Sequence, residues 1–127
     1  MANIGLIRCE KNQDRCPLTS CFISLRDNKE AFARHEDGNT LVGVFTCHCP
    51  GDTAVNMAKI LKSKGADVVH FSTCVFAGKQ DGAWIAGRGF CDAAEELCSR
   101  VAREANIPCV LGSAHLPAGH TPKTFGG

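Results

Sequence analysis

The chain lacks the features that mark several common classes of protein. It has no tyrosine, one tryptophan and no run of basic residues, and its formal net charge is only +1 at pH 7. We therefore expect no nucleic-acid partner, because nucleic acids select clustered basic and aromatic side chains. No stretch approaches the roughly 20 apolar residues that cross a bilayer, and residues 1–5 lack the charged and apolar segments of a signal peptide. The sequence predicts a cytoplasmic protein without membrane association, and it indicates neither a homo-oligomer nor a protein partner, although it leaves both open.

Cysteine, in contrast, is abundant, with nine in 127 residues. Disulfides are rare in a reducing cytoplasm, and an odd number of cysteines cannot pair completely within one chain. A domain of this length also buries a core without needing cross-links or a structural metal in order to fold. Metal ligation or redox chemistry is therefore the favoured explanation for the cysteines.

Four short apolar runs alternate with three helical patterns along the chain. The runs cover residues 3–8, 40–46, 67–73 and 107–112. Their near-continuous apolar character is typical of strands covered on both faces, and the alternation with helices is typical of βαβ units. We predict one α/β domain over residues 1–115, a three-layer parallel sheet of flavodoxin-like or Rossmann-like type with about four strands and three helices. Residues 116–127, which include two prolines and two final glycines, are expected to form an irregular tail.

The three helices are expected at well-separated places. The first should run from Pro17 to about His35, with its buried stripe on Leu18, Phe22, Leu25 and Phe32. The second should follow residues 50–52 and stop at Gly65. The third should start at Asp92, as a side-chain cap, and stop before residue 108. Residues 75–90 have no convincing period, and we expect a lid or a mobile insertion there.

Cysteines follow three of the four predicted strands. Cys9 follows the first strand, Cys47 and Cys49 follow the second, and Cys74 follows the third, while His115 lies just beyond the fourth. In an open parallel sheet, ligands bind beyond the carboxyl ends of the strands. The sequence therefore predicts that these side chains meet at one edge of the sheet.

Three further cysteines are expected at the same edge. Cys16 and Cys21 flank the opening of the first helix, and Cys91 precedes the third. We expect the positive end of a helix dipole to lower the pKa of such thiols, so that seven cysteines could converge as thiolates. Soft sulfur ligands suit an iron-sulfur cluster, which we favour slightly, or zinc. The candidate ligands are Cys9, Cys16, Cys21, Cys47, Cys49 and Cys74, with Cys91, His48 and His115 in second rank.

Several short motifs resemble one known family. They are Ile7-Arg8-Cys9-Glu10, Arg15-Cys16-Pro17-Leu18-Thr19 with Cys21, Ala31-Phe32-Ala33-Arg34, and residues 65–74, Gly-Ala-Asp-Val-Val-His-Phe-Ser-Thr-Cys. Together they resemble the CGGC domain family, a prokaryotic group regarded as metal-binding and rich in cysteine and histidine. The resemblance covers most of the chain and implies a metal-binding role.

The chain departs from the family pattern in two places. Cys47-His48-Cys49 has one histidine where two glycines separate the family's cysteines, which shortens the loop and adds a candidate nitrogen ligand. The family's closing Gly-Thr-His is similar to Gly112-Ser113-Ala114-His115, which is one residue longer. The resemblance implies a ligand role for His115.

Two other functions stay open. Cys9 and Arg15 have the spacing of low-molecular-weight phosphatases and related arsenate reductases, but Glu10 and Asp14 place negative charge where a phosphate would bind. Alternatively, Cys47 and Cys49 could cycle as a thiol-disulfide pair. A general acid or base cannot be identified from the sequence.

Some cysteines and histidines are better explained by packing. Cys98 lies on the apolar stripe of the third helix and Cys109 lies inside the fourth strand, and we predict that both are core residues. His70, within the third strand, is predicted to be a hydrogen-bonded core histidine. His35 is expected to be solvated.

Overall fold

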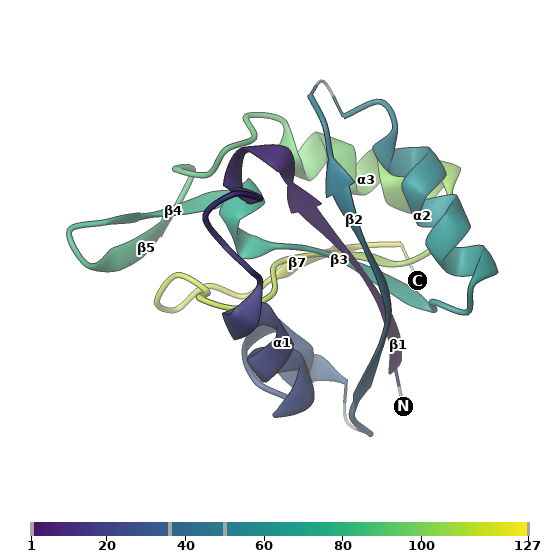
Figure 1. Cartoon of the computed structure of the whole chain (residues 1–127), viewed down its shortest axis with the longest axis horizontal. Coiled ribbons are helices and arrows are strands. Elements are labelled where there is room, and N and C mark those ends of the chain that lie inside the picture. Colours follow the sequence, from purple (N-terminus) through teal and green to yellow (C-terminus); the bar gives the residue numbers. More distant parts are fainter. Residues whose placement is uncertain (1, 36, 50, 127) are drawn as a thin grey trace.

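Five strands form one sheet in the computed structural model, which describes residues 2–35, 37–49 and 51–126. Their order across the sheet is β2-β1-β3-β6-β7 (Figure 1). The strands are β1 (Ala2–Cys9), β2 (Asn39–Cys47), β3 (Val68–Phe71), β6 (Cys109–Leu111) and β7 (Lys123–Phe125). β1, β2, β3 and β6 run parallel, and β7 pairs antiparallel with β6. The predicted α/β fold with a mainly parallel sheet is confirmed.

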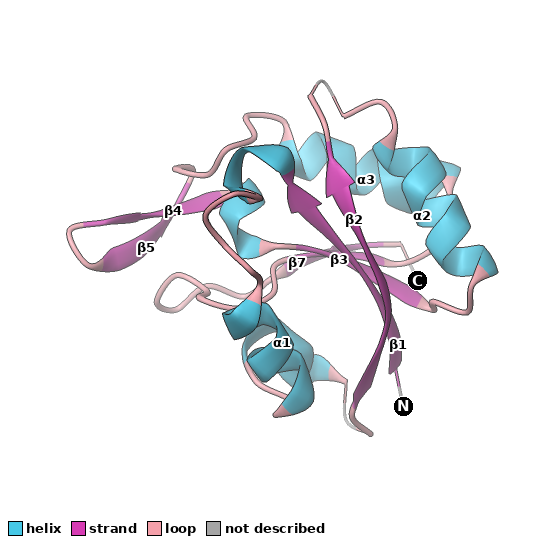
Figure 2. Cartoon of the chain, viewed as in Figure 1, coloured by secondary structure: helices cyan, strands magenta, loops and turns pink. Residues whose placement is uncertain are grey.

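Helices cover both faces of this sheet, which gives three layers (Figure 2). The α-helices are α1 (Thr19–Arg26), α2 (Ala54–Ser63) and α3 (Ala94–Glu104), and short 3-10 turns are η1 (Glu10–Asn12), η2 (Glu30–Arg34) and η3 (Thr73–Val75). Ile7 and Cys9 of β1 pack in the core under α2 and α3, whereas Ile4 and Leu6 pack on the face covered by α1 and η2. Alternate residues of one strand therefore serve the two cores.

α2 and α3 lie where the sequence places them. The buried side of α3 includes Leu97, Cys98 and Val101, as the helical period predicts. The expected side-chain cap is wrong, because Ala93 occupies the cap position and makes no side-chain hydrogen bond. Pro50, expected just ahead of α2, lies outside the described residues.

The first predicted helix is broken in the structure. Leu18 precedes α1 with a φ of 66°, and Asn28 and Glu30 adopt φ values of 57° and 54° after it. Residues in this left-handed region cannot continue a right-handed helix, so α1 ends at Arg26 and the chain re-forms the 3-10 turn η2. The predicted stripe is wrong at Phe22, which is 39% exposed.

Residues 75–90, expected to form a lid or a mobile insertion, contain a regular hairpin. β4 (Ala77–Gln80) pairs antiparallel with β5 (Ala83–Ala86). Asp81 and Gly82 connect them with φ values of 52° and 83°, the pair of positive angles that a two-residue hairpin turn requires. The dipeptide Asp-Gly between two short strands indicates this hairpin, whereas the spacing of apolar residues does not.

The C-terminal segment is also more ordered than the sequence predicts. Residues 116–127 are expected to be irregular, but β7 adds a strand to the edge of the sheet at β6. That edge would otherwise leave the backbone donors and acceptors of β6 unpaired. None of the helices in the described ranges has the length and apolar character needed to span a bilayer.

His70 confirms the prediction of a hydrogen-bonded core histidine. It is fully buried, its Nδ1 lies 2.9 Å from the carbonyl oxygen of Gly112, and its Nε2 lies 2.9 Å from Nε2 of His35. The prediction that His35 is solvated is wrong, since it is half-buried and paired with His70. Burial is the main cause that lowers the pKa of His70 from 6.5 to about 3.

We expect His70 to make the fold sensitive to mild acid. The unfolded chain takes up a proton near pH 6.5 and the folded chain only near pH 3, so this stability is complete above pH 6.5 and is lost as pH falls toward 3. The free energy of unfolding should fall by up to about 2 kcal/mol between pH 7.5 and pH 5. Urea unfolding at each pH measures this free energy. His70→Gln should flatten the dependence, and equal slopes in both proteins would contradict this assignment.

Candidate functional site

Parallel pairing brings the first two predicted ligands together. Cys9 and Cys47 are direct partners in the register of β1 and β2, so both thiols leave the same face of the sheet at its carboxyl edge. β2 lies on one side of β1, and β3 lies on the other, so the strand order reverses between β1 and β3. In open α/β sheets the binding crevice lies at such a reversal. Cys9 ends β1 and Cys74 follows β3, so they flank the reversal.

Four cysteines line one narrow cavity beneath α2 and α3. The cavity encloses about 30 Å³, and its apolar walls include Phe71, Val75 and Leu97. We refer to its cysteines as the first thiol group: Cys9, Cys47, Cys49 and Cys91. Cys9 is buried, Cys47 and Cys91 are half-buried, and Cys49 is exposed.

The environment of Cys9 and Cys47 favours neutral thiols. Burial is the main cause that raises the pKa of Cys9 above 9.0, and it raises the pKa of Cys47 to about 11. Neighbouring thiols add to both shifts, Cys91 most strongly for Cys47. The expectation of lowered pKa values is therefore wrong for Cys9 and Cys47, because desolvation by burial is the largest cause at both thiols and raises their pKa.

The remaining three candidate cysteines lie on the α1 side of the sheet. We refer to them as the second thiol group: Cys16, Cys21 and Cys74. They line a separate cavity of about 30 Å³ together with Ser113 and His115. Cys21 Sγ lies 3.1 Å from Ser113 Oγ, and burial raises the pKa of Cys21.

Cys74 connects the two thiol groups. It interacts electrostatically with Cys9 on one side and with Cys21 on the other, in both cases raising the pKa of its neighbour. Its Sγ lies 3.1 Å from Ser72 Oγ, and Cys74 as a residue is 9% exposed. The seven cysteines thus gather at one edge of the sheet, as the strand ends predict, but in two groups on opposite faces.

Neither second-rank histidine lines the cavity of the first thiol group. His48 points to Glu10, whose Oε2 lies 2.9 Å from His48 Nδ1 and also accepts the backbone N–H of Cys49 at 3.0 Å. His115 has a φ of 51° and stacks on Trp84 with 4.9 Å between ring centroids. The glutamate thereby holds the loop between Cys47 and Cys49 against η1.

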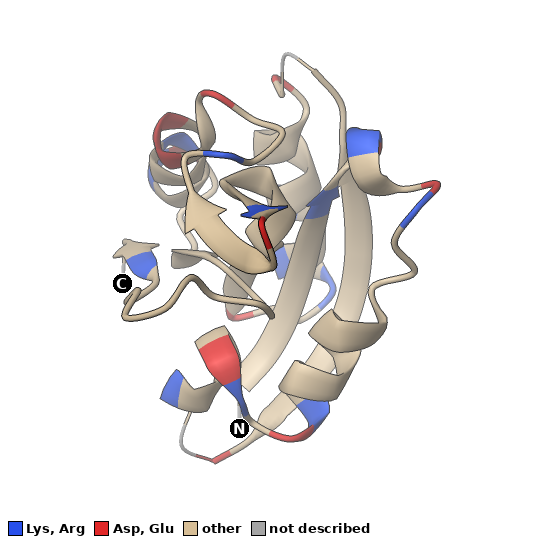
Figure 3. Ribbon diagram, turned by 90° about the vertical axis from the view of Figure 1, so that its left-hand side faces the viewer, with Lys and Arg blue, Asp and Glu red and all other residues tan. Residues whose placement is uncertain are grey.

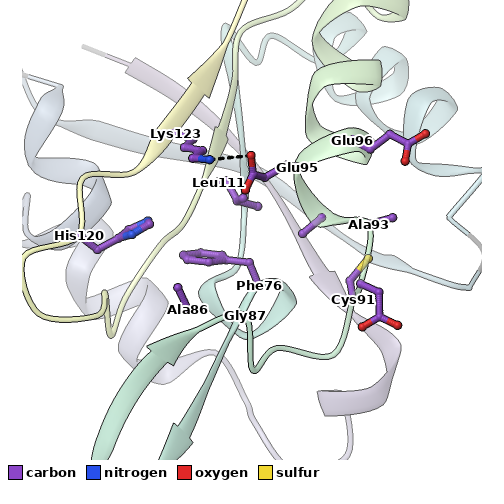
Figure 4. A pocket seen from close by; sticks show the side chains of 12 residues that line it. Phe76, Ala86, Gly87, Cys91, Ala93, Glu95, Glu96, Leu111, His120 and Lys123 are labelled. Carbon is purple, nitrogen blue, oxygen red and sulfur yellow. Dashed lines mark hydrogen bonds and ion pairs between the residues drawn. The ribbon is translucent and has the colours of Figure 1, made fainter.

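A larger cavity of about 470 Å³ adjoins the first thiol group and shares Cys91 with it. Figure 4 shows Phe76 and His120 on one side of this space and the ion pair between Glu95 and Lys123 across it. Cys91 therefore borders both cavities.

The donor set fits a soft metal, but its arrangement is not preassembled. Across residues 2–35, 37–49 and 51–126, no three candidate Cys, His, Asp or Glu ligands lie close enough to hold one ion. These thiols would have to move closer together before they could bind one ion. The thiols of the first thiol group are suitable ligands for zinc, but their present positions do not form a complete metal site.

The phosphatase-like pair does not share a cavity. Cys9 lines the cavity of the first thiol group, whereas Arg15 lines a different groove and lies over the ring of Phe90, 5.4 Å from its centroid. Residues 10–12 form the turn η1. The raised pKa of Cys9 also opposes its use as a nucleophile.

Two contributions to the site were missed by sequence reasoning. Ser113 Oγ accepts the N–H of Thr73 and contacts Cys21, which fixes the second thiol group to the end of β6. Glu10 holds the Cys47–Cys49 loop. A serine just after a strand and an acid just after Cys9 are the signals that could have indicated them.

The fold and site define an α/β domain with cysteine thiols gathered at the carboxyl edge of its sheet. A family model described as the CGGC domain matches residues 3–114, and the chain belongs to this family. The resemblance read from the sequence is thereby confirmed. Comparisons with curated proteins and with solved structures give no match.

The thiols should differ sharply in reactivity. Cys49 is exposed, whereas Cys47 is half-buried with its pKa raised to about 11, so little thiolate forms at Cys47 near neutral pH. Iodoacetamide should label Cys49 at least about tenfold faster than Cys47 in the reduced, metal-free protein. Tandem mass spectrometry separates the two positions within one peptide. Faster labelling of Cys47 would contradict the burial described here.

Proposed function

We propose that the domain binds a single thiophilic metal ion, zinc in the first place, through Cys9, Cys47, Cys49 and Cys91. The observation that carries this proposal is that these four cysteines, from three chain segments, line one narrow cavity. Four thiolates are a complete ligand set for tetrahedral zinc.

The size of the cavity supports one ion over a larger centre. At about 30 Å³ this cavity is far smaller than the adjoining one of about 470 Å³. An iron-sulfur cluster of four irons and four sulfides is much larger, so it would need the surrounding core residues to move apart. Zinc therefore fits this cavity with less reorganisation.

Charge supports the same proposal. Several thiolates in a buried space would repel one another, and burial already keeps Cys9 and Cys47 protonated near neutral pH. A divalent cation can replace those protons and neutralise the thiolates in their place. With raised thiol pKa values and no shared cavity for Cys9 and Arg15, nucleophilic catalysis by Cys9 has less support.

An iron-sulfur cluster is the second candidate, and one observation favours it. Cys74 is electrostatically coupled to Cys9 and to Cys21, so it could join sulfurs of both thiol groups around a centre with more than one metal. Such a cluster would suit electron transfer, sensing or sulfur handling.

Zinc affinity of cysteine-to-serine variants tests the proposal. Cys47→Ser should weaken zinc binding at least about tenfold, because it removes a thiolate ligand. Cys16→Ser, also half-buried but in the second thiol group, is the matched control and should leave the affinity unchanged. Anaerobic competition with a chromophoric chelator gives the affinity.

Equal losses in the two variants, or no zinc binding by the wild type, would contradict a site at the first thiol group. Broad visible absorption after anaerobic reconstitution with iron and sulfide, lost in Cys74→Ser, would favour the cluster instead.

Metal loading should also release protons. Because the pKa values of Cys9 and Cys47 lie above neutrality, ligation at pH 7 should displace nearly one proton for each thiol that binds. Affinity should therefore rise as the pH increases toward 9. Calorimetric titration in buffers of different ionisation enthalpy counts the protons. Zinc binding without proton release would exclude these thiols as ligands.

A further inference from the structure

A second feature, separate from the first thiol group, is a groove beside the hairpin. It encloses about 390 Å³, a volume within the range of small-molecule sites. Its side chains include three cations, Arg15, Lys79 and Arg88, two aromatic rings, Trp84 and Phe90, and the thiol of Cys74.

The charge of this groove is of one sign. Among the described residues that line it, none is acidic, and within the described chain none of the three cations makes an ion pair with a carboxylate. All three are exposed, so an ion can reach them from solvent. Figure 3 looks onto this side of the molecule and shows basic segments on and beside the hairpin. Three positive charges thus gather in a chain whose net charge is only +1.

Close backbone packing fixes the segment that carries Arg88. The N–H groups of Gly87, Phe90 and Cys91 donate to the carbonyls of Phe76, Cys74 and Val75 at 2.8–3.0 Å. A side chain at Gly78 would come within 2.2 Å of the Arg88 carbonyl, and one at Gly89 within 2.5 Å of the backbone at Ala77. Only glycine permits this approach, which holds Arg88 against β4.

The aromatic walls are also held in place. Lys79 and Trp84 are direct partners across the hairpin, so their side chains share one face. The Trp84 ring lies parallel to that of His115, with an interplanar angle of 2°. Arg15 lies over Phe90, which orients its guanidinium. The cations therefore belong to a supported groove and do not stand on independent loops.

From this geometry we infer that the groove binds a small oxyanion carrying two or more negative charges, of the phosphate or polycarboxylate class. Like charges around one cavity repel, and an anion between them removes that repulsion. Two guanidinium groups match the paired oxygens of phosphate and carboxylate, and Lys79 adds a third positive charge. This inference does not depend on metal binding, since the first thiol group contributes none of the three cations.

Trp84 provides a direct reporter, because it is the single tryptophan of the chain and lines the groove. The reduced, metal-free protein is titrated with pyrophosphate and, separately, with citrate at constant ionic strength. Trp84 fluorescence should change along a saturating curve with at least one of the two anions. A response to only one of them identifies the phosphate or the carboxylate source.

Variants locate the binding. Arg88→Gln and Lys79→Gln should each raise the dissociation constant about tenfold, the loss expected for one charge-assisted contact. Arg103→Gln, on the exposed side of α3, is the control and should bind like the wild type. A linear response, an equal response to sodium chloride, or equal affinity of the Arg88 and Arg103 variants would overturn the site. Because no metal is present, such a failure leaves the zinc proposal unaffected.

Discussion

The parallel pairing of β1 with β2 and β3 is the constraint on which the rest of the structure depends. It places Cys9 beside Cys47 in register and brings the turn that carries Cys74 to the same edge. Because neighbouring strands lie only about 4.8 Å apart, residues 38 positions apart in sequence become adjacent. A slip of one residue in β1 would turn Cys9 to the opposite face and dismantle the cavity.

Desolvation then determines the chemical state of the Cys9 and Cys47 thiols. In an apolar cavity the neutral thiol is favoured, so several cysteines can lie close together without mutual repulsion. The same burial would favour binding of a soft cation. Such an ion displaces the thiol protons, and its positive charge neutralises the thiolates that form. This balance explains how the fold could tolerate the thiols and also bind through them. The exposed position of Cys49 provides access from solvent.

The sequence predicts the elements better than their connections. Apolar runs locate the four parallel strands, and the alternation with helices indicates that cysteines after them share an edge. The positions of the strands do not show on which face of the sheet each following loop lies, because that depends on tertiary packing. The division into two thiol groups was therefore not predicted. The break after α1 depends on positive φ values at Asn28 and Glu30, which no periodicity reveals. The hairpin, in contrast, carries a local signal in Asp81-Gly82.

X-ray absorption at the zinc edge, recorded on the metal-loaded and fully reduced wild-type protein, tests the central claim most directly. The account predicts a first coordination shell made of sulfur alone, at the zinc–sulfur distance of about 2.3 Å. A shell dominated by nitrogen or oxygen would show that the thiols at the ends of β1 and β2 do not share a metal, and it would contradict the account.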